Sequence, residues 1–271
     1  MCIQRASVKF AFSLPKDWRM IKKEDFFIEE NKVLYVSDED YAQMRKYIQL
    51  LEAVSRTTYK SIYVIDFFRK NFLYVSKNSL FLCGMPVEKV TSMGFDFYLQ
   101  QVTDADLPLL LEINQKGFTF AESLLPADRM EYTLGCDIHM KQPWGNAMLI
   151  HHEITPLHLT REGKIWLVLC IESLSSRTKS GNIEITRQGY HSHWQYHMES
   201  KKWIQSAEIA LNDYEKEILL LSAQGFTMKE ISKQIHKSID TIKGYKRALF
   251  EKLKVSNITE AIGLAIQQKL I

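Results

Sequence analysis

The sequence from residue 227 to residue 253 reads TMKEISKQIHKSIDTIKGYKRALFEKL and contains two helical patterns separated by a short break. In the first pattern, Ile231 and Ile235 lie about one helical turn apart. Thr227 and Glu230, three residues later, form a capping box, which satisfies the free amide groups at a helix start. The stretch therefore predicts a helix with a defined beginning, followed closely by a second helix.

The second helical pattern begins after Ser238, a favourable N-cap residue. Its apolar positions recur at helical spacing: Ile242, Tyr245, Leu249 and Leu253. Three cations fall largely off this apolar face: Lys243, Lys246 and Arg247. A helix that buries one side on a small bundle and presents cations on the other fits the major groove of DNA. The stretch thus predicts a helix-turn-helix that binds DNA.

The whole chain has 271 residues, a length that favours about two domains. Hydrophobic residues make up 46% and charged residues 25%, which is ordinary for a globular protein and argues against disorder. The net charge of +3 does not by itself indicate nucleic acid, but between residues 237 and 254 six cations face two acidic residues, a local excess of +4. The positive charge is concentrated where the helix-turn-helix is predicted.

The four cysteines, Cys2, Cys83, Cys136 and Cys170, are far apart and form no metal-finger spacing. We interpret them as reduced thiols of a cytoplasmic protein. No apolar run approaches the length that spans a bilayer, so we expect no contact with a membrane.

Residues 1–59 are interpreted as an N-terminal extension and a helix. A short strand is predicted at Lys32–Val36. Ser37 caps the helix, which carries acidic residues in its first turn and ends near Tyr59. We interpret it as a helix that packs on the following domain or on a second copy of itself.

Residues 60–174 alternate between strand-like and helical segments. The predicted strands are Ser61–Phe68, Asn71–Ser76, Met130–Met140, Ala147–Leu159 and Lys164–Ser173. The predicted helical segments are Asn78–Gly84, Pro86–Met93 and Asp104–Lys116, the last of which ends before Gly117. This order resembles the PAS fold, an antiparallel sheet with helices across one face, which serves as a sensory or dimerisation domain. Residues 175–210 are interpreted as a linker that contains a β-hairpin turning at Gly189.

Residues 211–271 predict four short helices. Three pairs at capping-box spacing punctuate them: Asn212 with Glu215, Thr227 with Glu230, and Asn257 with Glu260. Gly225 stands where a left-handed residue would end the first helix. With the Thr-Ile-Lys sequence that starts at Thr241, these residues resemble the LuxR/GerE family of DNA-binding domains. The fold class is therefore α+β: a PAS-like antiparallel sheet with helices, followed by an all-α four-helix LuxR-type helix-turn-helix domain.

The resemblance implies a set of DNA-binding residues: Thr227, Lys229, Ser238, Thr241, Lys243, Gly244, Lys246 and Arg247. Lys243 and Arg247 would reach base edges or nearby phosphates, and Lys246 would contact the backbone. Thr227 and Lys229 would meet phosphate at a helix start. Gly244 departs from the family, whose members often place a base-contacting side chain there. The last helix would contribute to dimerisation through Ala261, Ile262 and Ala265.

Several other kinds of site are disfavoured by the sequence. His191, His193 and His197 would share a strand face, but no acidic or cysteine cluster accompanies them, so no metal is expected. His151 and His152 point to opposite faces of a strand. Cys83 lacks the flanking residues of a flavin-reactive cysteine, and we expect no cofactor. A small-molecule ligand of the PAS-like domain stays open, and its binding residues are unknown.

The sequence therefore predicts a sequence-specific transcription regulator of the LuxR family, and no enzyme, because no nucleophile or paired carboxylates can be assembled. Its expected partners are double-stranded DNA, a second copy of the chain and, as a candidate, RNA polymerase. An alternative is an adaptor that uses the same two domains to bind protein. The expected location is the cytoplasm.

Overall fold

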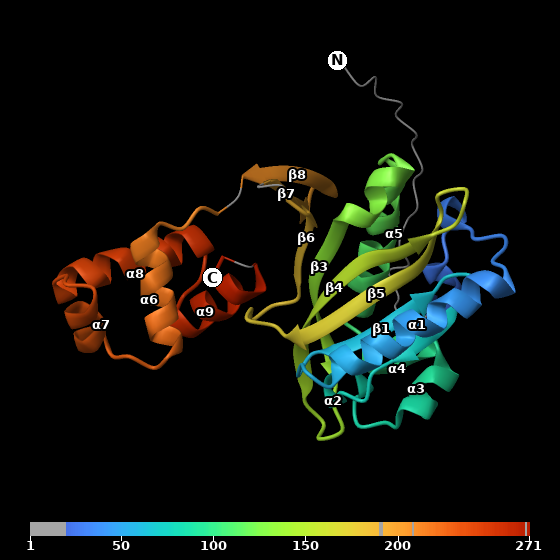
Figure 1. Ribbon diagram of the computed structural model, residues 1–271, viewed down its shortest axis with the longest axis horizontal. Coiled ribbons are helices and arrows are strands. Elements are labelled where there is room, and N and C mark those ends of the chain that lie inside the picture. Colours follow the sequence, from blue (N-terminus) through green and yellow to red (C-terminus); the bar gives the residue numbers. More distant parts are fainter. Residues whose placement is uncertain (1–19, 190–191, 208, 269) are drawn as a thin grey trace, which may run out of the picture.

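Eight strands form one antiparallel sheet in the order β2-β1-β5-β4-β3-β6-β7-β8 (Figure 1). The strands are β1 (Ser61–Asp66), β2 (Asn71–Val75), β3 (Tyr132–Lys141), β4 (Ala147–Leu159), β5 (Ile165–Leu174), β6 (Gly181–Arg187), β7 (Ser192–His197) and β8 (Lys202–Ala207). The computed structural model describes residues 20–271 except 190, 191, 208 and 269, so the predictions for Cys2 and His191 lie outside the described residues.

Helices cover both faces of the sheet at the β1–β5 side. They are α1 (Asp38–Ser55), α2 (Ser79–Leu82), α3 (Val87–Met93), α4 (Asp96–Gln101) and α5 (Leu107–Glu122), with 3-10 turns at Lys23–Phe26, Glu29–Asn31 and Pro126–Glu131. The residues of β1 alternate between the two faces. Tyr63 and Ile65 join the core beneath α5, whereas Ile62 and Val64 pack with Met44 of α1. All six residues of β1 are therefore buried.

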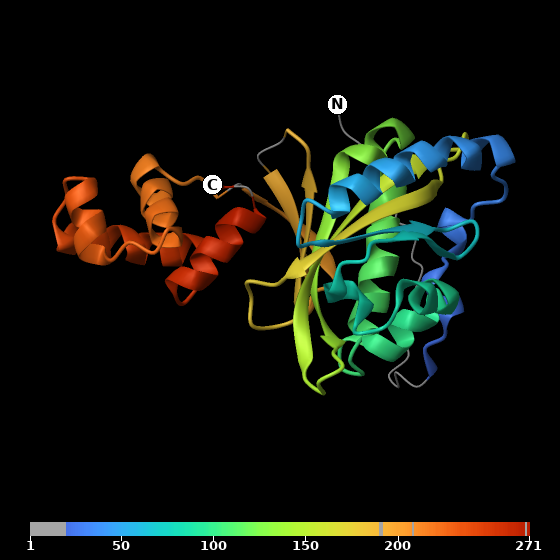
Figure 2. The ribbon, with the colours of Figure 1, turned by 60° about the horizontal axis from the view of Figure 1, so that its bottom comes forward.

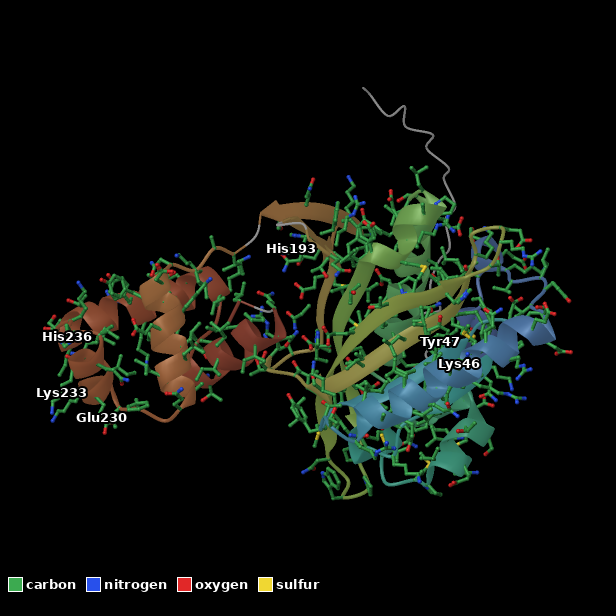
Figure 3. The ribbon with its side chains drawn as sticks, in the orientation of Figure 1. Lys46, Tyr47, His193, Glu230, Lys233 and His236 are labelled. Atoms are coloured by element: carbon green, nitrogen blue, oxygen red, sulfur yellow. The ribbon has the colours of Figure 1, made fainter. Side chains whose placement is uncertain are left out.

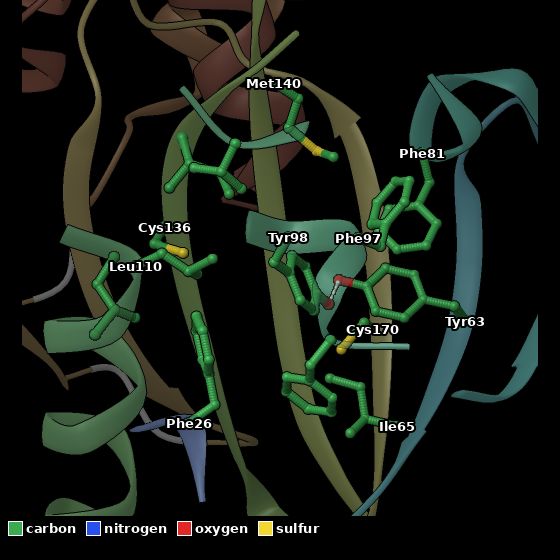
Figure 4. Packing of buried hydrophobic residues seen from close by; sticks show 14 of the residues in the cluster. Phe26, Tyr63, Ile65, Phe81, Phe97, Tyr98, Leu110, Cys136, Met140 and Cys170 are labelled. Carbon is green, nitrogen blue, oxygen red and sulfur yellow. Dashed lines mark hydrogen bonds between the residues drawn. The ribbon is translucent and has the colours of Figure 1, made fainter. Parts of the chain in front are cut away.

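The main core lies between the sheet and helices α2 to α5. Figure 4 shows its aromatic residues and buried thiols, among them Phe26, Tyr98 and Cys170. The Tyr98 hydroxyl donates a hydrogen bond of 2.9 Å to the Tyr63 hydroxyl. Burial in this core raises the pKa of the Cys136 and Cys170 thiols, so both are protonated and inert at neutral pH.

Residues Lys32–Val36, which the sequence predicted as a short strand, form no strand. The reason lies one residue earlier. The Asn31 side chain is buried and makes two hydrogen bonds to the backbone of Ile165, one to its carbonyl at 2.9 Å and one from its amide at 2.8 Å. The Asn31 side chain thus ties this segment to the first residue of β5, whose two neighbours in the sheet are β1 and β4.

The prediction that Gly117 ends a helix is wrong, because α5 continues through it to Glu122. A Cβ atom at residue 117 would lie 2.9 Å from Cδ1 of Leu134 on β3. A side chain at residue 117 would have to displace the end of the Leu134 side chain, so glycine lets the helix backbone lie close to the sheet. Gly117, which the sequence pattern predicted to follow a helix end, thus lies where α5 contacts β3.

Residues 175–210, expected as a linker with a hairpin, contain three strands that extend the sheet. β6 pairs with β3, and β7 and β8 follow it in antiparallel order. Glu112 of α5 stabilises this extension. It is 4% exposed and accepts hydrogen bonds of 2.7 Å from the Tyr196 hydroxyl and from Nζ of Lys201. The segment is thus part of the folded sheet domain.

Four helices follow the sheet, as the capping residues predicted. They are α6 (Asp213–Ala223), α7 (Met228–Gln234), α8 (Ile239–Leu253) and α9 (Ile258–Gln267), which form a separate bundle beside β6 (Figures 1 and 2). The capping boxes at Asn212 and Thr227 are complete. At Asn257 only half of the box forms, because the Glu260 carboxylate accepts hydrogen bonds from the amide and hydroxyl of Ser256. Gly225 adopts a left-handed conformation, with φ of +86°.

The attachment of β7 and β8 can be tested at Glu112. We expect Glu112→Leu to lower the free energy of unfolding by about 1–3 kcal/mol, because the buried Tyr196 hydroxyl loses its acceptor. Adding Tyr196→Phe should restore part of the loss, since both polar partners are then gone. Chemical denaturation measures both variants.

The matched control is Asp104→Asn, which removes a carboxylate from an exposed ion pair with Lys141. We expect it to change the unfolding free energy by less than about 1 kcal/mol. An equal loss in Glu112→Leu and Asp104→Asn would contradict the assignment of Glu112 as the stabilising residue.

Candidate DNA-binding surface

A sharp turn separates α7 from α8. His236 adopts a left-handed conformation, with φ of +52°, and the Lys237 amide donates a hydrogen bond of 3.1 Å to the Ser232 carbonyl. The Ser232 hydroxyl donates a further hydrogen bond to the Lys237 carbonyl. The Ser238 hydroxyl then caps α8 by accepting from the Thr241 amide. Side-chain hydrogen bonds therefore fix both the turn and the start of α8.

An apolar core holds α8 against α6 and α7. Ile231 and Ile242 are wholly buried together with Ile218 of α6. At the edge of this core, the rings of Tyr245 and Tyr214 stack with centroids 5.3 Å apart. Because one face of α8 is buried in this way, its other face is held outward in a fixed orientation.

The structure places all the predicted DNA-binding residues at the surface of the helix-turn-helix. The exposed ones are Thr227, Lys229, Ser238, Thr241, Lys243, Gly244 and Arg247, and Lys246 is half-buried. Lys243 makes a 3.0 Å ion pair with Asp240, whose side chain is 89% exposed. Burial lowers the pKa of Lys246, so desolvation disfavours its charge. Among the described residues the structure shows no acidic partner for Lys246.

Lys243, Lys246 and Arg247 line one open groove of about 630 Å³. Its other wall contains Met228 of α7 and Asn257 at the start of α9. From the sequence, Asn257 was expected only to cap α9, and Met228 was not among the predicted site residues. A sequence pattern does not show that the α8–α9 turn folds back beside the cations.

Thr227 is less available for phosphate than the sequence suggested. Its amide and its hydroxyl both donate to the Glu230 carboxylate, at 2.7 and 2.6 Å. These hydrogen bonds lower the pKa of Glu230, which is therefore ionised at neutral pH. A phosphate at this helix start would compete with the carboxylate, whereas Lys229 stays exposed.

Two of the residues predicted for dimerisation lie inside the domain. Ala261 and Ala265 are wholly buried in a cluster with Leu249 and Leu264, so they pack their own helix and present no surface to a partner. The prediction failed because small residues at helical spacing fit a bundle core as well as an interface. Ile262 is half-buried, and Ile266, which was not predicted, is 55% exposed.

Gly244 lies on the exposed side of α8, and a Cβ atom built there meets nothing within 4 Å. The glycine is therefore not required by the packing of the domain. It leaves bare backbone between Lys243 and Arg247.

A second candidate site is a cavity of about 120 Å³ between α5 and the sheet. Most of its lining is apolar, including Phe67, Phe118 and Val168, and His152 of β4 contributes a polar group. The Nδ1 atom of His152 lies 3.1 Å from the Glu172 carboxyl. The Nε2 atom of His152 and the second oxygen of Glu172 are buried and find no hydrogen-bond partner in the described part of the chain.

Burial disfavours the charged form of both of these groups. Desolvation lowers the pKa of His152 to about 3 and raises that of Glu172 well above its usual value. The cavity therefore combines a largely apolar wall with His152, which can make hydrogen bonds, and Arg129, which is paired with Glu122.

Within the described residues, no three His, Cys, Asp or Glu side chains are arranged to hold a metal ion. No helix among residues 20–271, apart from the four omitted positions, is long and apolar enough to cross a membrane.

Comparison with known proteins gives one family match. Residues 210–265 match the sequence model described as "Bacterial regulatory proteins, luxR family". None of the curated proteins matches this chain significantly.

Three solved structures are among those to which this chain is similar. Phage VqmA in complex with DPO is 16% identical and covers 85% of this chain and 91% of its own, with a TM-score of 0.35. The Vibrio cholerae VqmA dimer without target DNA is 18% identical and covers 86% of this chain and 88% of its own, with a TM-score of 0.32. A PAS domain from Colwellia psychrerythraea is 15% identical and covers 47% of this chain and 96% of its own, with a TM-score of 0.35.

Because these identities and TM-scores are low, the assignment depends on the family match and on the order of elements. Two strands, short helices and three further strands form an antiparallel sheet with α2 to α5 on one face, as expected for a PAS-like fold. Residues 210–265 thus form a DNA-binding domain of the luxR family of bacterial regulatory proteins, and this domain follows a PAS-like sheet domain.

Proposed function

We propose that this protein is a sequence-specific transcription regulator that forms a homodimer and binds double-stranded DNA through α8. The observation that carries the proposal is the position of Lys243, Lys246 and Arg247, which line one groove on the free side of a helix-turn-helix. A regulator of this kind acts in the cytoplasm, and RNA polymerase is a candidate partner.

In this proposal α8 enters the major groove with its exposed side toward the bases. Lys243 and Arg247 reach base edges, and the exposed ion pair of Lys243 with Asp240 costs little to break. Lys246 meets a phosphate. Because its charge is partly desolvated without DNA, an anion beside it would offset a cost already present in the fold.

The PAS-like domain is proposed to sense a small molecule in its cavity. The largely apolar wall and the uncharged His152 favour a neutral molecule that can form hydrogen bonds, because Arg129, a charged residue of the lining, is already paired with Glu122 at 2.9 Å. A cavity of about 120 Å³ is close to the size that holds benzene in another protein, roughly 150 Å³.

The DNA-binding proposal is tested by selecting binding sites from random duplexes with the full-length protein. We expect enrichment of one sequence with two half-sites on the same face of the helix, about 10 base pairs apart. Folded protein that enriches no sequence at any salt concentration would refute the regulator and favour an adaptor.

Single variants distinguish the proposed contacts. Lys246→Ala should weaken binding to all sequences and reduce the slope of log affinity against log salt by about one, because one phosphate contact is lost. Lys243→Ala and Arg247→Ala should also change the selected sequence, with a loss of about 1–3 kcal/mol at the affected base. Fluorescence anisotropy titrations measure both effects.

The control is Lys46→Ala, which removes the same charge from the exposed surface of α1 (Figure 3). Its affinity and salt slope should equal those of the wild type. If Lys46→Ala and Lys246→Ala behave alike, the effect is one of net charge and the assigned contact is wrong.

Gly244 provides a separate prediction about stability. Gly244→Ala should raise the free energy of unfolding by about 1 kcal/mol, because alanine favours the helix and the added methyl group meets open space. Gly225→Ala is the contrasting control and should lower stability, since residue 225 has a positive φ. Thermal unfolding of the two variants gives the comparison.

The sensory proposal is tested by mass spectrometry of protein purified from its native host and then denatured. We expect a neutral small molecule to be released, and its return should raise the melting temperature of the native protein. His152→Leu should reduce the amount released while the protein stays folded. Equal amounts from the variant and the wild type would contradict the role of His152.

A further inference from the structure

Helix α9 contacts two parts of the molecule at once. Ala261, Leu264 and Ala265 face the core of the helical bundle. Other residues of the same helix lie against the sheet domain, and the ribbon shows α9 as the helix of the bundle nearest β6 (Figures 1 and 2). The contact involves Gly263 and Gln267, followed by Gln268.

Gln267 makes the central contact with the sheet. Its amide nitrogen lies 2.9 Å from both ring nitrogens of His151 on β4, and its amide oxygen accepts from the Ser176 hydroxyl at 3.2 Å. Next to it, the Gln268 amide donates to the Glu184 carboxyl of β6 at 3.4 Å. Side chains from two strands and from the segment after β5 thus converge on the end of α9.

His151 is itself held rigidly. It is 3% exposed, and its Nδ1 atom lies 2.9 Å from the Asp137 carboxylate, which is wholly buried. Asn182 donates to the other oxygen of Asp137 at 2.8 Å. A histidine ring fixed in this way presents a defined partner to Gln267.

Gly263 allows the close approach of α9 to the segment after β5. A Cβ atom at residue 263 would lie 2.6 Å from Cβ of Ser176, closer than two such atoms can come. Glycine weakens a helix by about 1 kcal/mol relative to alanine. Its presence in the middle of α9 is therefore explained by the contact and not by the helix.

The contact leaves the recognition helix free. Lys243 and Arg247 of α8 are exposed in the same structure in which Gln267 contacts His151. The docked arrangement therefore does not mask the proposed DNA-binding surface. It holds that surface in one orientation relative to the sheet.

We propose that Gly263 and Gln267 are positioning residues that determine which spacing of DNA half-sites the dimer accepts. The proposal rests on the dimeric DNA binding proposed above. When each recognition helix is held on its own sheet domain and the dimer forms through the sheet domains, the distance between the two helices is fixed. Half-sites at any other spacing are then bound less tightly.

The first test does not require DNA. Nitroxide labels are placed at Lys46→Cys and Lys233→Cys, both exposed positions (Figure 3), in a chain that also carries Cys2→Ser. Cys83, Cys136 and Cys170 are buried. Pulsed electron–electron double resonance then gives the distribution of distances between the two labels of one chain. The labelled protein is diluted with unlabelled protein, so that distances between chains do not contribute.

We expect a narrow distribution in the parent protein and a broad one after Gly263→Ala or Gln267→Ala. Gly263→Ala is the sharper variant, because it creates a clash with Ser176 while it favours the helix. Thr259→Ala, an exposed position on the same helix, is the control and should leave the distribution narrow. A broad distribution in the parent, or an equally narrow one in all variants, would overturn the proposal.

The second test uses duplexes that carry two selected half-sites with zero to ten inserted base pairs. The wild type should lose about tenfold or more in affinity when half a helical turn, about 5 base pairs, is inserted. In Gly263→Ala and Gln267→Ala the loss should shrink to about threefold or less, because a tethered but undocked domain can reach both spacings.

Affinity for a single half-site distinguishes a failure of the positioning role from a failure of the proposed DNA binding. It should be the same in the wild type and in both α9 variants, since neither residue lies on the DNA-binding surface. Spacing profiles that stay identical in all proteins would refute the positioning role alone. No binding of the wild type to any duplex would refute the proposed function, and the distance distributions would still decide whether α9 is docked.

Discussion

The pairing of β6 with β3 determines where everything after residue 181 lies. Through it, a segment that resembles a linker in the sequence becomes the last three strands of an eight-stranded sheet. The buried Glu112 of α5 reinforces the extension from the helical side. Because β8 then ends at a fixed position, the four helices that follow begin beside the sheet, and α9 reaches β4 and β6.

The sequence predicted well those features that depend on neighbouring residues. The boxes at Asn212 and Thr227 and the left-handed Gly225 concern groups a few residues apart, and all form as expected. The failures involve partners far away in the chain. Gly117 was read as a helix end because its partner, Leu134, lies on a distant strand. For the candidate site, the exposed cations were found from periodicity, whereas the burial of Ala261 depends on how four helices pack.

Strand β4 contributes both to the cavity and to the contact with α9. The side chains of His152 and His151 point to opposite faces of the sheet, because successive residues of a strand alternate. His152 lines the cavity beneath α5, and His151 contacts Gln267 of α9. The alternation of side chains along a strand predicted that this pair could not share a site, and each histidine has a separate partner in the structure. One short stretch of backbone therefore lies between the proposed ligand and the DNA-binding domain.

The connection between β8 and α6 has a mechanical consequence. Only five residues separate Ala207 from Asp213, and a chain of that length spans at most about 20 Å. The helical bundle thus stays within a short radius of the sheet edge even when α9 is undocked, at an effective local concentration of roughly millimolar order. A few hydrogen bonds, far too few to join two separate proteins, are then sufficient to shift the balance between docked and undocked chains.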